Sequence, residues 1–219
     1  MNKNKGVIFD LDGVIVDTAK FHFLAWQKLA NDLGFDITEA QNEQLKGVSR
    51  VSSLEKILEW GNVKLSQDKF MEQMAMKNDN YLTYICSMTK KDILPGVGTM
   101  IDYLSENSIP FALGSASKNA RTILEKTDLI QRFNAVVDGN DVSKAKPNPE
   151  VFLIAAGKIN IPSENCIVFE DSVAGVQAAN IAKMTSIGIG QKSNLFEAHY
   201  VFKDFTEIDK DFIIKLLKN

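Results

Sequence analysis

The sequence predicts an α/β fold with a doubly wound parallel sheet, into which an all-helical cap domain is inserted. Two observations predict it. Short apolar, strand-like runs alternate with helical stretches along most of the chain, as in sheets covered by helices on both faces. Residues 18–91, by contrast, show helix-like spacing and no convincing strand, which is too long for an ordinary connection between neighbouring elements.

In chain order, strands are expected at residues 7–9, 111–114, 135–137, 167–169, 185–189 and 200–202. Helices are expected at 150–158, with Pro149 at its start, and at 173–182, with Ser172 as the N-cap. We therefore assign residues 1–17 and 92–219 to the α/β core domain and residues 18–91 to the cap domain.

Within the expected cap domain, apolar residues recur at helical spacing. Phe21, Ala25, Leu29 and Leu33 share one face of a first helix, which Gly34 ends. Large apolar side chains are expected in the core of the cap domain rather than at a cofactor: Trp26, Trp60, Phe70, Met71 and Met74.

Two carboxylates, Asp10 and Asp12, follow the first strand directly, and Gly13 then breaks the run. In open parallel sheets, ligands bind beyond the carboxyl ends of the strands. Two anions held close together there favour a hard cation such as Mg²⁺. One carboxylate can then attack phosphorus while the other handles a proton. The alternative is an ordinary polar turn, because Asp and Gly are common turn residues.

A second acidic pair, Glu170 and Asp171, follows the strand expected at 167–169 and precedes a helix. The pattern repeats that of the first strand, so both pairs are expected at the same edge of the sheet. Acidic residues are also favoured at helix starts by the helix dipole alone, which is the alternative reading of this pair.

Two other strand ends offer groups that bind anions. Ser115, Ala116, Ser117, Lys118 and Asn119 place hydroxyls, backbone amides and a lysine before a helix. Lys146 precedes a turn rich in proline. Taken singly, such residues are usually helix caps or solvated charges.

These motifs, in this order, resemble those of the haloacid dehalogenase superfamily, whose core is a Rossmann-type sheet. The resemblance implies that Asp10 is the nucleophile and Asp12 the general acid/base, with the backbone carbonyl of Asp12 as a metal ligand. It also implies that Glu170 and Asp171 complete a Mg²⁺ site. It further implies that the transferring phosphate is bound by Ser115, Ala116 and Lys146.

Segments of the expected cap domain indicate one family within this superfamily. The segments Leu-Lys46-Gly47-Val-Ser-Arg50 and Lys77-Asn-Asp-Asn-Tyr, together with Ser-Ala-Ser-Lys-Asn at 115–119, resemble the β-phosphoglucomutase family of that superfamily. The resemblance implies interconversion of β-glucose 1-phosphate and glucose 6-phosphate, with β-glucose 1,6-bisphosphate as activator and intermediate.

A mutase has to hold a phosphate at each end of a sugar, so it needs a second anion site. Arg50, with a guanidinium suited to phosphate, and Ser117, Lys118 and Asn119 suit that role. The further substrate-binding candidates are Lys46, Gly47, Ser53 and Lys77. Thr18 and His22 lie four residues apart, so they share a helix face and are expected to orient Asp12.

Two other functions remain open. One is a phosphatase of the same superfamily that acts on sugar phosphates or phosphoglycolate, and the other is a catalytically silent protein that binds phosphosugars. Intact Asp10 and Asp12 weigh against the silent protein, whereas the segments around Arg50 and Lys77 weigh against a simple phosphatase.

Composition limits the remaining classes. The 219 residues are 45% hydrophobic and 24% charged with a net charge of −3, which gives no indication of nucleic-acid or membrane binding. The two cysteines, Cys86 and Cys166, imply no disulfide framework, and no signal-peptide or membrane-spanning run stands out. We expect a cytoplasmic monomer that acts on a small phosphorylated sugar.

Overall fold

The computed structural model describes residues 5–46 and 48–218. Within these ranges a six-stranded parallel sheet has the order β3-β2-β1-β4-β5-β6. The strands are β1 (Gly6–Phe9), β2 (Phe111–Gly114), β3 (Ala135–Val137), β4 (Cys166–Glu170), β5 (Thr185–Ile189) and β6 (Tyr200–Phe202). Each expected strand is confirmed, and β1 lies near the centre of the sheet.

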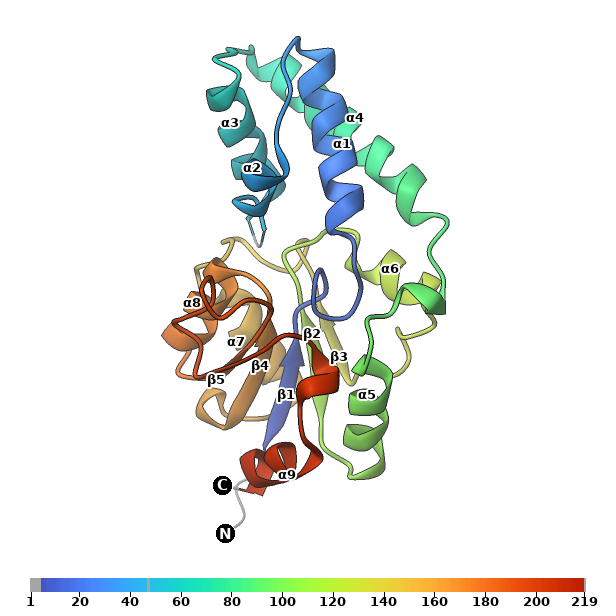
Figure 1. Ribbon diagram of the computed structural model, residues 1–219, viewed down its shortest axis with the longest axis vertical. Coiled ribbons are helices and arrows are strands. Elements are labelled where there is room, and N and C mark those ends of the chain that lie inside the picture. The colour runs from blue at the N-terminus through green and yellow to red at the C-terminus, as the bar shows by residue number, and fades with distance from the viewer. Residues whose placement is uncertain (1–4, 47, 219) are drawn as a thin grey trace.

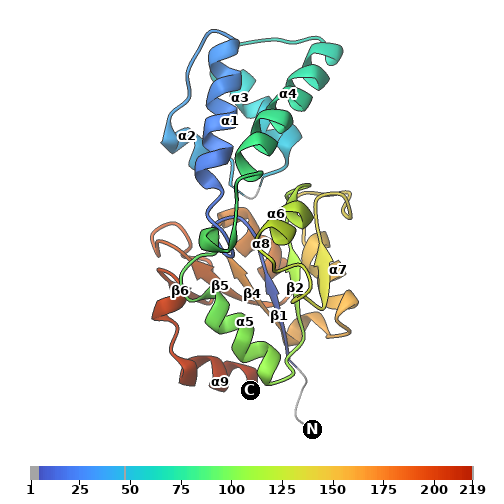
Figure 2. The same ribbon diagram turned by 90° about the vertical axis from the view of Figure 1, so that its right-hand side faces the viewer.

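Helices cover both faces of the sheet (Figures 1 and 2). One face packs against α5 (Val97–Glu106), α6 (Ala120–Lys126) and α9 (Lys210–Lys218). The other packs against α7 (Glu150–Lys158) and α8 (Val173–Ile181). The doubly wound fold is therefore confirmed. Short 3-10 turns at Lys90–Asp92, Ser163–Asn165 and Phe205–Glu207 complete the connections.

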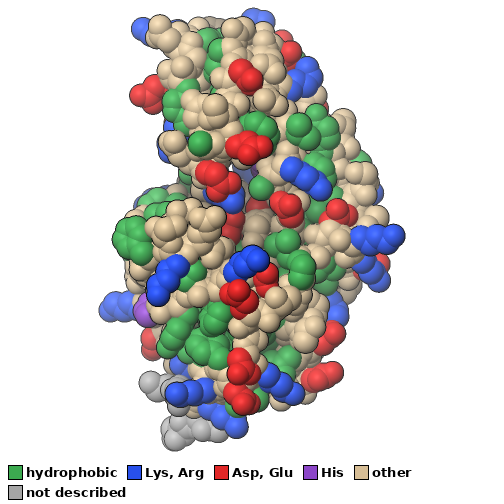
Figure 3. Space-filling model, viewed as in Figure 1, with side chains coloured by type: hydrophobic (Ala, Val, Ile, Leu, Met, Phe, Trp, Pro, Cys, Tyr) green, Lys and Arg blue, Asp and Glu red, His purple; other side chains and the backbone are tan. Residues whose placement is uncertain are grey.

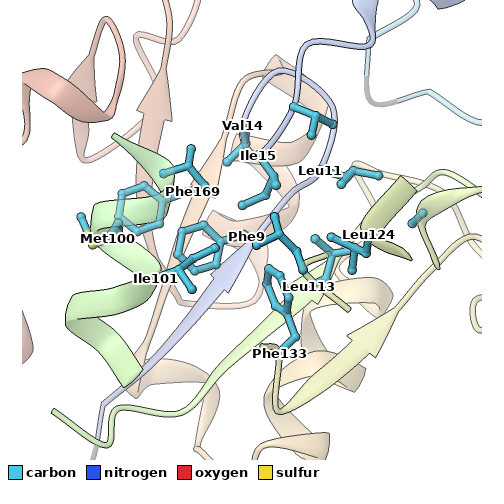
Figure 4. Packing of buried hydrophobic residues seen from close by; sticks show 14 of the residues in the cluster. Phe9, Leu11, Val14, Ile15, Met100, Ile101, Leu113, Leu124, Phe133 and Phe169 are labelled. Carbon is cyan, nitrogen blue, oxygen red and sulfur yellow. The ribbon is translucent and has the colours of Figure 1, made fainter. Parts of the chain in front are cut away.

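The larger core is built around the side chain of Phe9 (Figure 4). Its ring stacks on that of Phe169 at a centroid distance of 5.2 Å and meets Phe133 edge-on at 6.1 Å. Such aromatic pairs contribute about 0.5–1.5 kcal/mol each beyond the burial of their area. Because Phe9 and Phe169 immediately precede Asp10 and Glu170, this packing fixes the two strand ends that carry the acidic residues.

Among the described residues between β1 and α5, four α-helices form a separate layer over the carboxyl end of the sheet (Figures 1 and 2). They are α1 (Ala19–Asp32), α2 (Glu39–Glu43), α3 (Arg50–Trp60) and α4 (Gln67–Ile85). Gly34 follows α1 with a φ of +92°, a backbone conformation that favours glycine and ends the helix as expected. The expected helical insertion is confirmed, and its exact bounds, residues 18–91, stay a prediction.

The helical layer has its own apolar core, to which Trp26, Trp60, Phe70 and Met74 contribute as expected. The prediction for Met71 is wrong, because this residue of α4 is 57% exposed. An unbranched apolar residue on an amphipathic helix can fall at the edge of the apolar stripe, where spacing alone does not place it.

The two segments that join the helical layer to the sheet run beside each other. Val16 forms an antiparallel bridge with Ile93, and the amide of Leu94 donates to the carbonyl of Ile15 at 2.9 Å. The layer therefore connects to the sheet through two chain segments that are hydrogen-bonded to each other. Across the part of the chain that the structure describes, no helix has the length and apolar character needed to cross a membrane.

Candidate active site

Strand register brings the sequence motifs together. Phe9 lies between Leu113 of β2 and Phe169 of β4, so the residues that follow all three strands emerge side by side at the carboxyl edge. The amide of Asp10 donates to the carbonyl of Phe169 at 2.9 Å. Asp10 therefore lies beside Glu170, although the two are far apart in the sequence.

Lys146 joins these carboxylates from the connection between β3 and α7. Its Nζ lies 2.5 Å from Oδ1 of Asp10 and 2.7 Å from Oε2 of Glu170. Burial opposes its charge, but the two carboxylates outweigh this and raise the pKa of Lys146. Burial, together with the charge of Glu170, raises the pKa of Asp10 well above its ordinary value. Two carboxylates thus share a single ammonium, and a further cation or a proton is needed to balance their charge.

Asp10, Glu170 and Asp171 each place a carboxylate oxygen within 4.8 Å of the others. Burial raises the pKa of Asp171 to about 7, and the neighbouring Glu170 contributes to the rise. Hard oxygen donors in a buried group with excess negative charge fit Mg²⁺. The backbone of Gly13 packs directly against Asp171, because a Cβ on Gly13 would lie 2.1 Å from Oδ2 of Asp171.

The side chain of Asp12 is contacted from the start of α1, in the helical layer over the sheet, which we call the cap layer. Thr18 donates a hydrogen bond to Oδ1 of Asp12, and Nε2 of His22 lies 3.9 Å from the same oxygen. Burial raises the pKa of Asp12 while the Thr18 contact lowers it. Thr18 and His22 thus lie where the sequence predicted. The predicted role of the Asp12 backbone carbonyl as a metal ligand stays a prediction.

His22 receives a second contact from α4, since Nζ of Lys77 lies 3.0 Å from its Nδ1. Burial, with Lys77 and Arg50 nearby, lowers the pKa of His22 well below its ordinary value. Burial also lowers the pKa of Lys77 to about 7, and Arg50 contributes.

The loop after β2 carries the expected anion-binding groups. Ser115 is fully buried, and its Oγ accepts from the amide of Ser117 at 3.1 Å. The amide of Asn119 in turn donates to Oγ of Ser117, and its side chain donates to Oδ1 of Asn78 in α4 at 3.0 Å. Ala116, Ser117, Lys118 and Asn119 all line the cavity described below.

Two cations reach the same site from the cap layer. Nζ of Lys46 lies 3.5 Å from Oδ2 of Asp171. Arg50 is the first residue of α3, and burial lowers its pKa. Ser53, one turn further on, is 2% exposed. Gly47 lies outside the described residues, so its predicted role in substrate binding is untested.

A cavity of about 540 Å³ separates the cap layer from the sheet, and both parts line it. Figure 3 shows acidic and basic side chains around the hollow between the upper and lower parts of the molecule. Asp10, Asp12 and Asp171 lie on the side of the sheet, and Lys46, Arg50 and Ser53 on the side of the cap layer.

Some lining residues were not predicted as site residues. Trp26 and Met74 were assigned to the apolar core alone, yet they also face the cavity. Trp26 could have been found, because it lies four residues after His22 on the same helix face. Asn42, Val51, Ser143 and Lys144 also line the cavity. Val51 and Lys144 lie within two residues of the predicted Arg50 and Lys146, and that proximity could have indicated them.

The fold and the carboxylate cluster together define a family of phosphoryl-transfer and hydrolytic enzymes. The chain belongs to the haloacid dehalogenase-like hydrolase family, whose model matches residues 7–189. It is 39% identical to the β-phosphoglucomutase of Bacillus subtilis strain 168 over 206 residues, which cover 93% of this chain and 91% of that protein.

The chain is also similar to a solved structure of a protein with the same name as this relative. The crystal structure of β-phosphoglucomutase from Clostridium difficile matches with a TM-score of 0.93 and 40% identity, covering 97% of this chain and 96% of that one. A phosphorylated carbohydrates phosphatase from Thermotoga maritima is 29% identical, covering 84% of this chain and 83% of that protein. The resemblance to the superfamily noted in the sequence is confirmed.

Proposed function

We propose that this protein is a Mg²⁺-dependent β-phosphoglucomutase. It interconverts β-D-glucose 1-phosphate and glucose 6-phosphate through β-glucose 1,6-bisphosphate, which also serves as activator. One observation carries the proposal. Asp10, which is paired with Lys146, lies on the sheet side of the cavity, and a second cation, Arg50, lies on the cap side of the same cavity. The similarity to β-phosphoglucomutases over nearly the whole chain supports the same activity.

In the proposed reaction, an oxygen of the Asp10 carboxylate attacks one phosphorus of the bisphosphate. The bond from phosphorus to the sugar oxygen breaks as the aspartyl phosphate forms, and Asp12 gives that oxygen its proton. With the other hydroxyl of a monophosphate facing Asp10, the steps reverse, and Asp12 removes the proton of the attacking hydroxyl. Thr18 and His22 hold Asp12 in place for both directions.

Asp10, Glu170 and Asp171, with the backbone carbonyl of Asp12, would hold the metal ion. When bound, Mg²⁺ supplies positive charge to the oxygens of the transferring phosphoryl group. Lys146 places an ammonium beside the same oxygens, and Ser115 and Ala116 offer a hydroxyl and an amide to them. These residues make up the proposed contacts with the transferring phosphoryl group on the sheet side of the cavity.

On the cap side, the proposal assigns binding of the distal phosphate and of the sugar hydroxyls. Arg50 grips the phosphate with its planar guanidinium. The remaining proposed substrate contacts are Lys46, Gly47, Ser53, Lys77, Ser117, Lys118 and Asn119. Residues 18–91 act as the cap that excludes water during transfer. We further propose that the protein is a monomer, since a single chain supplies both sides of the cavity. A cytoplasmic location is part of the same proposal.

A phosphatase acting on phosphorylated sugars is the second candidate, and the relative from Thermotoga maritima favours it. A product assay separates the candidates. Supplied with β-glucose 1-phosphate, Mg²⁺ and a trace of the bisphosphate, a mutase yields glucose 6-phosphate, whereas a phosphatase yields glucose and inorganic phosphate. A silent binding protein turns over neither.

The Arg50→Ala variant tests the distal site itself. Mutase turnover should fall steeply, while phosphorylation of Asp10 by acetyl phosphate should change little, because that small donor does not reach Arg50. Arg50→Lys should recover part of the loss, since it keeps the charge but not the planar fork. If both donors lose activity together, Arg50 supports the fold or the reactive phosphate instead.

A further inference from the structure

The loop that follows β2 is tied to the turn that follows β3. The amide of Gly139 donates to the carbonyl of Ser117, and the side chain of Asn140 donates to the carbonyl of Lys118, both at 3.2 Å. The backbones approach closely, because a Cβ on Gly139 would lie 2.3 Å from the carbonyl oxygen of Ala116. The geometry of residues 115–119 therefore depends on residues 138–141, which we call the bracing turn.

An arginine outside the cavity holds the bracing turn. Arg121 lies in the first turn of α6, directly after the loop, with Nε 2.9 Å from Oδ2 of Asp138. Its Nη2 lies 3.1 Å from Oδ2 of Asp141 and donates to the carbonyl of Val136 at 3.0 Å. One side chain thus connects the helix after the loop to three groups of the neighbouring segment.

The pair of Arg121 and Asp138 is asymmetric in burial. Asp138 is 1% exposed, while the side chain of Arg121 is 48% exposed. The other carboxylate oxygen, Oδ1, accepts from the amide of Asn140 at 2.8 Å. Removing the guanidinium would leave a buried carboxylate without its counter-charge, which is strongly unfavourable. The turn would also lose its connection to α6 through Arg121, so the turn and the loop to which it is bonded would shift.

We propose that Arg121 is a positioning residue for the substrate-binding loop at residues 115–119, and that it acts through Asp138 and the bracing turn. The inference rests on the proposed function, because it takes that loop to bind the sugar phosphate. Arg121 is not among the described residues that line the cavity. Its effect on substrate is therefore indirect, through the positions of Ser117 and Lys118.

The two variants Arg121→Ala and Asp138→Asn test the proposal, and Arg132→Ala is the matched control. Arg132 is also a partly exposed arginine in an ion pair, 2.7 Å from Asp102, but it lies away from the loop. Ser117 and Lys118, whose carbonyls accept from the bracing turn, are assigned to substrate binding rather than to the transferring phosphoryl group. Their displacement should therefore raise KM for the sugar phosphate about 10-fold with kcat within about 2-fold. Arg132→Ala should leave both unchanged.

A double variant separates positioning from simple stabilisation. Arg121→Ala with Asp138→Asn removes the uncompensated buried charge, so thermal stability should return toward that of the native protein. The connection between α6 and the turn stays cut, so KM should stay raised. Arg121→Lys can reach only one carboxylate at a time and should recover part of the affinity. If KM recovers together with stability, or never rises, the proposal is wrong.

Calorimetric titration with glucose 6-phosphate distinguishes failure of this inference from failure of the proposed function. Arg121→Ala should weaken binding about 10-fold relative to Arg132→Ala, whatever product the native enzyme makes. If the native enzyme only hydrolyses the sugar phosphate while this difference is observed, the mutase proposal fails and the positioning role stands. Equal affinities in Arg121→Ala, Arg132→Ala and the native enzyme would overturn the positioning role.

Discussion

Replacing Gly175 with alanine should have two opposing effects. It should favour the helical conformation, and it should bring the new Cβ too close to Glu170. Gly175 lies in the first turn of α8, and within a helix alanine is favoured over glycine by about 1 kcal/mol. A Cβ at this position, however, would lie 2.0 Å from Cδ of Glu170 and 2.2 Å from its Oε2. The carboxylate would have to move until ordinary contacts of 3.4–4 Å were restored.

The contacts of Glu170 give the size of the effect. It accepts from the amide of Ser172 at 3.1 Å, from Oγ of Ser172 at 2.6 Å and from Lys146 at 2.7 Å. Hydrogen bonds to charged groups contribute about 1.5–3 kcal/mol each, so the loss of even one outweighs the helix preference. We expect a net loss of roughly 2 kcal/mol in the free energy of unfolding, and at least about 10-fold weaker Mg²⁺ binding.

Gly157→Ala is the control, because Gly157 lies exposed in α7 and its added Cβ would meet nothing within 4 Å. It should gain about 0.5–1 kcal/mol and bind Mg²⁺ normally. Denaturant unfolding without metal and calorimetric titration with Mg²⁺ measure both quantities. If Gly175→Ala matches Gly157→Ala in stability and metal affinity, Glu170 is neither held in place as described nor a ligand.

Three further predictions follow from the site. Lys77 has a pKa of about 7, below the ordinary 10.5, so the cost of burying its charge is fully present below pH 7 and disappears as pH rises toward 10.5. Lys77→Met should therefore gain up to about 5 kcal/mol of unfolding free energy at pH 6, and the gain should shrink from pH 7 upward; a gain independent of pH would contradict this. Asp12→Asn should lose turnover but keep Mg²⁺ affinity, whereas Asp171→Ala should lose both, and equal loss of metal binding would refute the division of roles. Asp10→Asn should fold normally but accept no phosphoryl group from the bisphosphate, as mass spectrometry of the protein would detect.

Much of the sheet could be predicted from the sequence because most of its strands are short apolar runs that end at a polar or acidic residue. The run before Asp10 and the run before Glu170 follow this pattern, and the structure places both where expected. The order of the strands could not be predicted in this way. Periodicity identifies a strand, but it does not say which strand lies beside it.

The candidate site was predictable where its residues follow strand ends and unpredictable where two helices meet. Asp10 and Glu170 share an edge because parallel strands end together. The contact of Lys77 with His22 depends on how α4 packs against α1, across 55 residues of sequence. Met71 and Met74 show the same limit, because helical spacing marks an apolar side chain without saying whether it faces a core, a cavity or solvent.

The pairing of Val16 with Ile93 has a consequence for the modularity of this chain. The two ends of the helical insertion are already held together by the sheet domain, so exchanging the insertion for a shorter or longer one changes the loop-closure entropy only slightly. Exchange of the insertion would therefore change the contacts proposed on the cap side of the cavity, while Asp10, Glu170 and Asp171 stay in the sheet domain. A chimaera that keeps residues up to Val16 and from Ile93 onward, with a helical segment from a relative between them, should retain an intact carboxylate cluster.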